Sequence, residues 1–235
     1  MAIHRIQTEA DFKNYGKARQ QHVTIPDEWD ENNGQTRVDD PTWIERYRYE
    51  AEIINGICER NGYKKVIELG SGPGTLGQCV LELNPEIEYT YVDKHAAREV
   101  FKAKNYVGNF HVKDLMDSFD LSDLDNDYDL VVANDFLEHI ANPSDVMFKC
   151  RQITKDKGGF FISVPNWRMG HDFIYRGLFD YDNFIYFCQV HGWSPEEVAG
   201  SPLKCQALPK LSSEDTMPTE LLDSWNWYFY TQKQD

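Results

Sequence analysis

The chain has 235 residues, 41% of them hydrophobic, which is enough to fold one sizeable α/β domain around a packed core. Its net charge of −15 disfavours a DNA or anionic-membrane partner, because both need a basic surface. No apolar run approaches the roughly 18 residues of a membrane span, and the N-terminus has no apolar signal region, so we expect a cytoplasmic protein.

The first part of the chain, residues 1–42, is polar and irregular. It contains Tyr15, His22 and Trp29, which suit a lid over a ligand, whereas its polar composition also suits a disordered tail. Both interpretations stay open. We therefore divide the chain into an N-terminal lid or cap segment, 1–42, and one domain, 43–235.

From Pro41 onward, predicted strands and helices alternate. The predicted helices cover 41–61, 76–83, 95–103, a segment from Pro143 to the pair Gly158-Gly159, and 181–191. The predicted strands cover 65–69, 87–93, 109–113, 128–134, 160–166, 196–203 and 225–231. This alternation predicts an α/β fold with a parallel sheet and right-handed crossovers.

A glycine-rich turn follows the first predicted strand. The strand ends at Glu68-Leu69, and Gly70, Gly72 and Gly74 then occupy every second position before a helix begins. A strand, a tight glycine turn and a helix bring bare backbone against a nucleotide-like ligand at the carboxyl edge of the sheet.

Two carboxylates follow the next two strands. Asp93 lies 23 positions beyond Gly70, where a carboxylate can accept both hydroxyls of a ribose. Asp114 follows the third strand, beside the place where an adenine edge would lie. Nicotinamide and flavin fingerprints place their glycines as G-x-G-x-x-G, whereas Thr75 follows Gly74 here, so the spacing disfavours a dehydrogenase.

Residues 128–143 read Tyr-Asp-Leu-Val-Val-Ala-Asn-Asp-Phe-Leu-Glu-His-Ile-Ala-Asn-Pro. Together with the glycine turn and Asp93, this segment resembles the class I S-adenosylmethionine (SAM)-dependent methyltransferases, in the branch with a Leu-Glu-His motif after strand four. The resemblance covers residues 45–165 well and 166–235 loosely. It implies a Rossmann-like, mostly parallel seven-stranded sheet with an antiparallel last strand and helices on both faces. It also implies SAM as cofactor and S-adenosylhomocysteine (SAH) as product.

The resemblance further implies a role for residues at the ends of the first four strands. The turn with Glu68 would hold the methionine moiety, and Asn134 would lie near its amino group or the sulfonium. Asp93 would bind the ribose, Lys94 would flank the adenine, and Asp114 with Leu115 would read the adenine edge. The implied cofactor-binding residues are Glu68, Gly70, Gly72, Gly74, Asp93, Lys94, Asp114, Leu115 and Asn134.

The segment Asp135-x-x-Glu138-His139 allows three interpretations. Glu138 and His139 brace the turn after strand four, or His139 is a general base, or these three side chains bind a divalent metal with His171 or His191. The third interpretation follows a similar Glu-x-x-Glu-His arrangement in quinone-precursor and small-RNA O-methyltransferases, in which the first residue is one methylene longer than Asp135. We keep His139 as the candidate catalytic residue and assign no metal.

The loop after the fifth strand carries the candidate acceptor-binding residues, which are Trp167, Arg168, His171 and Arg176. Its aromatic side chains would clamp a planar or cationic acceptor, although core packing explains them equally well. Arg168 or Arg176 would bind a carboxylate or phosphate of the substrate through charge-assisted hydrogen bonds.

The resulting prediction is an enzyme, a SAM-dependent methyltransferase that acts on an oxygen or nitrogen atom of a small-molecule acceptor, as a monomer or a homodimer. An RNA or protein methyltransferase and a non-catalytic adenosyl-ligand-binding partner protein are the alternatives. The retained glycines and Asp93 favour catalysis over the last of these.

Overall fold

The computed structural model describes residues 41–115, 119–165, 178, 181–201 and 226–234. The predicted lid therefore lies outside the described residues, except for the start of the first helix. In the part described, every helix is too short or too polar to cross a bilayer.

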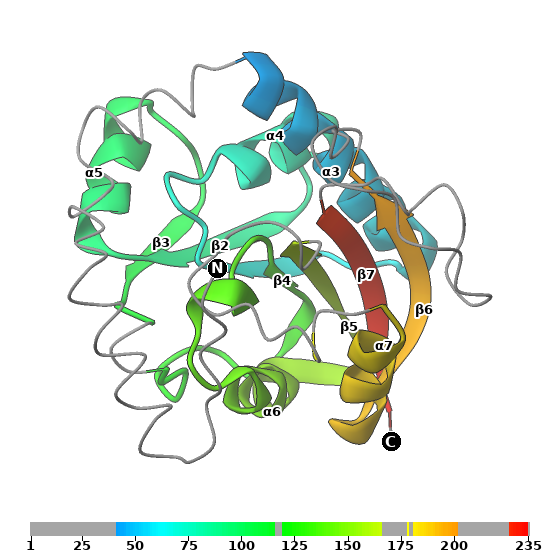
Figure 1. The fold of residues 1–235 in the computed structure, drawn as a ribbon. Helices are drawn as coiled ribbons and strands as arrows, with labels where there is room; N and C mark the ends of the chain where they lie inside the picture. The colour runs from blue at the N-terminus through cyan, green and yellow to red at the C-terminus, as the bar shows by residue number, and fades with distance from the viewer. Residues whose placement is uncertain (1–40, 116–118, 166–177, 179–180, 202–225, 235) are drawn as a thin grey trace, which may run out of the picture.

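One sheet of seven strands forms the centre of the molecule, in the order β3-β2-β1-β4-β5-β7-β6 (Figure 1). The first five strands pair in parallel, and β7 runs antiparallel to both β5 and β6. The predicted Rossmann-like sheet with an antiparallel last strand is thus confirmed. The strands are β1 (Lys65–Leu69), β2 (Glu88–Asp93), β3 (Asn109–Val112), β4 (Tyr128–Ala133), β5 (Thr154–Pro165), β6 (Trp193–Gly200) and β7 (Asn226–Lys233).

Helices pack against both faces of the sheet (Figure 1). The helices α3 (Pro41–Asn61), α4 (Thr75–Leu83) and α5 (His95–Ala103) contribute to one buried cluster. The short 3-10 helix η1 (Leu137–His139) and the helices α6 (Pro143–Ile153) and α7 (Tyr181–Val190) contribute to the other. The sheet separates two apolar cores, as expected when crossover helices cover both faces.

The side chains of the central strands alternate between these two cores. In β4, Val131 and Ala133 join the core of α6, whereas Leu130 and Val132 join the core of α3, and all four are fully buried. This is the period of two that a strand imposes on its side chains. The continuous apolar run predicted for strand four reflects burial on both faces.

The end of α6 differs from the prediction. The helix ends at Ile153 rather than at the pair Gly158-Gly159, and Thr154 already has extended backbone angles of −92° and 133°. The Thr154 hydroxyl donates to the Cys150 carbonyl at 2.6 Å and so satisfies one terminal carbonyl of the helix. A side chain at Gly158 would come within 2.5 Å of Thr154 Cγ2, so this glycine permits close packing inside a strand instead of stopping a helix.

The two C-terminal strands also have boundaries that differ from the prediction. β6 begins at Trp193, three residues before the predicted start at 196, and β7 continues two residues beyond 231 to Lys233. Trp193 pairs with Lys233, is fully buried, and donates from Nε1 to the Met147 carbonyl at 3.1 Å. Both strands are therefore longer than predicted because Trp193 pairs across to β7 and packs into the core. The local sequence pattern does not reveal such contacts.

Candidate functional site

The glycine turn connects β1 to α4 through left-handed backbone. Gly70, Gly72 and Gly74 have φ angles of 69°, 53° and 88°. The Gly70 amide donates to the Val92 carbonyl at 2.9 Å, which holds the turn against the end of β2. These conformations are open to glycine at little cost, and they bring backbone without a bulky side chain to the carboxyl edge of the sheet.

Gly70 is also required for packing, and this gives a testable prediction. A Cβ at Gly70 would lie 2.4 Å from Phe136 Cδ2, whereas Gly62, with the same φ of 69°, has nothing within 4 Å of its Cβ position. We expect Gly70→Ala and Gly62→Ala to share a conformational loss of about 1–2 kcal/mol. Gly70→Ala should lose a further 1–3 kcal/mol or so through overpacking. Urea unfolding of both variants measures this difference, and equal losses would contradict it.

Asp93 binds the glycine turn directly. One carboxylate oxygen accepts the Gly72 amide at 2.6 Å, and the other accepts the Lys94 amide at 2.6 Å. Burial raises the pKa of Asp93, and the two backbone donors oppose this effect. Because an ionised carboxylate has about four acceptor positions, each oxygen can still accept a hydrogen bond from a ligand hydroxyl.

The residues predicted to surround an adenine lie near Asp93. Lys94 Nζ is 3.7 Å from Asp114 Oδ2, and both side chains are more than 40% exposed. The Leu115 side chain is 4% exposed and belongs to the apolar core, so only its backbone can face a ligand.

Glu68 is the penultimate residue of β1, and its partner Tyr89 belongs to the buried cluster that includes α3. Glu68 is 3% exposed, and its Oε2 accepts the Tyr89 hydroxyl at 3.1 Å. Burial raises the pKa of this carboxyl well above its ordinary value, with Glu50 and Asp93 adding to the effect.

Asn134 follows β4 and points its amide at α3. Its Nδ2 donates to Glu50 Oε2 at 3.1 Å, and Glu50 is completely buried. Asn134 Oδ1 is also buried and has no hydrogen-bond partner among the described residues. A buried acceptor without a partner is costly, so this oxygen suits a ligand that donates a hydrogen bond.

Asp135 is held by protein donors on both oxygens. Arg46 Nη2 donates to Oδ2 at 2.5 Å, and Ser163 Oγ donates to Oδ1 at 2.9 Å. The amide of Asn226 donates to Oδ1 as well. With an arginine cation beside it, Asp135 is a poor ligand for a divalent metal. The described residues contain no group of three or more His, Cys, Asp or Glu side chains that could hold one.

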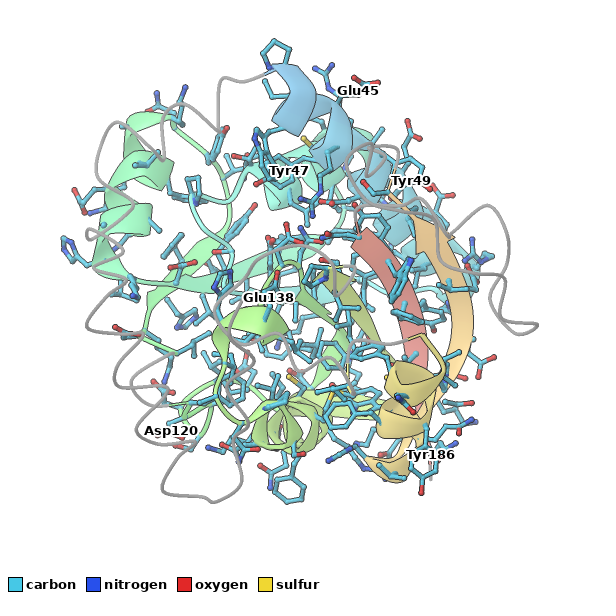
Figure 2. The ribbon with its side chains drawn as sticks, in the orientation of Figure 1. Glu45, Tyr47, Tyr49, Asp120, Glu138 and Tyr186 are labelled. Carbon is cyan, nitrogen blue, oxygen red and sulfur yellow. The ribbon has the colours of Figure 1, made fainter. Side chains whose placement is uncertain are left out.

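Glu138 and His139 form the end of η1, and Glu138 lies near the centre of the molecule in Figure 2, far from the peripheral Asp120 and Tyr186. Glu138 is 0% exposed, and neither of its carboxylate oxygens has a partner among the described residues. Burial, with the charge of Asp135, raises its pKa to about 8. His139 is partly exposed, as a general base must be to reach an acceptor.

Trp167, Arg168, His171 and Arg176 lie outside the described residues. His191 follows α7, where its Nδ1 lies 2.8 Å from the Phe187 carbonyl of the same helix.

Sequence reasoning missed the residues that α3 and β7 bring to the end of β4. Arg46 and Glu50 are spaced as an i, i+4 ion pair, which on most helices is exposed, yet they are 2% and 0% exposed. Ser163, Asn226 and Tyr228 arrive from β5 and β7. No local signal identifies them, because their proximity depends on strand order.

Comparison with known proteins identifies a methyltransferase domain in the chain. Residues 67–161 match the family described as "Methyltransferase domain". The ubiquinone biosynthesis O-methyltransferase of Histophilus somni (strain 2336) is 24% identical over 169 residues, covering 64% of this chain and 69% of that protein. The protein of the same name from Pasteurella multocida (strain Pm70) is 24% identical over 175 residues, covering 64% and 70%.

Solved methyltransferase structures have a similar fold. The plantazolicin methyltransferase BpumL, in complex with a monoazolic desmethylPZN analogue and SAH, aligns with a TM-score of 0.64 at 13% identity, covering 97% of this chain and 99% of that one. The CurJ carbon methyltransferase aligns with a TM-score of 0.59 at 16% identity, covering 86% of this chain and 57% of that one. Residues 67–161 are thus a methyltransferase domain, and together with the fold these similarities support a class I SAM-dependent methyltransferase, with SAM as cofactor and SAH as product.

Proposed function

We propose that this methyltransferase acts on an oxygen or nitrogen atom of a small-molecule acceptor. The observation that carries the proposal is the similarity to proteins named ubiquinone biosynthesis O-methyltransferase, over about two thirds of the chain. The net charge of −15 supports it, because an RNA substrate would be repelled by so acidic a protein.

We assign the cofactor to the carboxyl edge of β1, β2 and β4. The carboxylate of Asp93 keeps acceptor positions for ribose hydroxyls, and Lys94 and Asp114 lie beside it for the adenine. The glycine turn would bring backbone without side chains beside the methionine moiety, and Asn134 Oδ1, which has no partner among the described residues, would accept a hydrogen bond from its ammonium group. These donors and acceptors fit the adenosyl ligand, which supplies an electrophilic methyl group when bound.

On the acceptor side, the chain must orient the nucleophile and exclude water. A hydroxyl acceptor also needs a base, and we assign this role to His139, which lies partly exposed beside the buried Glu138. Trp167, Arg168, His171 and Arg176 stay candidates for holding the acceptor.

A panel of acceptors tests the proposed class. The purified protein is incubated with SAM and, separately, a catechol, an aliphatic amine, a short single-stranded RNA and an unstructured peptide, and SAH formation is measured. We expect turnover with the catechol or the amine. Turnover confined to the RNA or the peptide would contradict the proposal. A control lacking acceptor corrects for spontaneous hydrolysis.

A further inference from the structure

Two buried charged side chains of α3 reach the end of β4. Arg46 Nε donates to Glu50 Oε1 at 2.6 Å, and the Tyr228 hydroxyl donates to the same oxygen at 2.8 Å. The second oxygen, Oε2, accepts the amide of Asn134 at 3.1 Å. Neither α3 nor β7 lies within the segment 67–161 that matches the methyltransferase family, so this chain builds the contact from flanking elements.

Glu50 determines which atom Asn134 presents to the site. The oxygen and nitrogen of an asparagine amide have nearly the same shape, so the hydrogen-bond partners decide its orientation. Glu50 is fully buried, and its three hydrogen-bond partners, Arg46, Tyr228 and Asn134, all act as donors to it. Burial raises the pKa of Glu50 to about 7, and the charge of Arg46 opposes this rise, so above this pH the Glu50 carboxylate can only accept hydrogen bonds. The nitrogen of Asn134 then faces Glu50, which leaves Oδ1 as the buried atom without a partner among the described residues.

We propose that Glu50 is a positioning residue, which fixes the Asn134 amide so that its oxygen accepts a hydrogen bond from the α-ammonium group of the cofactor. This inference rests on the placement of the cofactor proposed above. Through Asn134, a helix outside the matched family segment sets the polarity of the methionine end of the site. An acceptor at this point favours a ligand that carries an ammonium donor.

The variant Glu50→Gln tests this role. Its new amide nitrogen would oppose the nitrogen of Asn134, and rotation of the Asn134 amide would relieve the conflict by turning a donor toward the ligand. We expect the Kd for SAH to rise by roughly 10- to 100-fold, the value of one charge-assisted hydrogen bond. The Kd for 5′-methylthioadenosine, which lacks the ammonium group, should not change. Glu52→Gln, on the exposed face of the same helix, should change neither value.

A second substitution separates positioning from general damage. In the double variant Glu50→Gln/Asn134→Asp, the new carboxylate can accept from the new amide and still present an oxygen to the ligand, so SAH affinity should recover. Asn134→Asp alone places two carboxylates together and should not improve binding.

Calorimetric titration of every variant with SAH and with 5′-methylthioadenosine measures both Kd values. Equal losses for SAH and 5′-methylthioadenosine, or a double variant as weak as Glu50→Gln, would overturn the positioning role. Because binding alone is measured, the result is independent of whether the acceptor is a small molecule, which the acceptor panel tests separately.

Discussion

Replacing Asp93 with alanine is expected to weaken SAH binding by about 1.5–3 kcal/mol, or roughly 10- to 150-fold in Kd. Two contributions add to this loss. The ligand loses a charged acceptor for its ribose hydroxyls, and the Gly72 and Lys94 amides lose the carboxylate that holds the turn in place. Calorimetric titration with SAH measures the effect, and an unchanged affinity would reject the ribose assignment.

Asp129 provides a matched control for Asp93. It also accepts two backbone amides, those of Lys64 at 2.9 Å and Lys65 at 2.8 Å, but it does so at the amino end of β1, the opposite edge of the sheet. Asp129→Ala should lower the free energy of unfolding and leave SAH affinity unchanged. If both variants lost affinity equally, the effect of Asp93→Ala would be a general loss of structure.

The second large effect concerns Glu138 and pH. Burial, with the charge of Asp135, raises its pKa from an ordinary 4.5 to about 8, so the folded protein retains a proton that the unfolded chain releases. The stability contributed by this group is complete below about pH 4.5 and is lost as the pH rises to about 8. Between pH 5 and pH 8 the loss is on the order of 3 kcal/mol.

The variant Glu138→Gln removes this titration. We expect its free energy of unfolding, relative to that of the wild type, to rise by on the order of 3 kcal/mol between pH 5 and pH 8. Urea unfolding at intervals across this range is the measurement. Glu88→Gln, at an exposed position of β2, should keep a constant difference from the wild type. A constant difference for Glu138→Gln as well would mean that Glu138 has an ordinary pKa.

The sequence predicted some elements of the fold correctly and others wrongly. The apolar run in β4 and the glycines after β1 predicted buried parallel strands and a bare turn, because both patterns are dictated by local backbone preference and burial. The end of α6 was predicted wrongly, because Gly158 serves the packing of β5 against Thr154 and the Asp129 carbonyl. A glycine needed for tertiary packing and a glycine that ends a helix look the same in a sequence.

The sequence by itself therefore determined three local features. These are the order of strands and helices, the left-handed glycine turn, and a carboxylate at the end of β2. Tertiary structure alone decided the surroundings of Asn134 and Asp135, where α3 and β7 bring Arg46, Glu50 and Tyr228. Arg46 and Tyr228 are 182 positions apart in the chain, and the strand order places β7 beside β5. Burial raises the pKa of Glu50 and of Tyr228, whereas the charges of Asp135 and Glu50 raise that of Arg46 against the effect of burial. These shifts arise only once distant segments have come together and excluded water from between them.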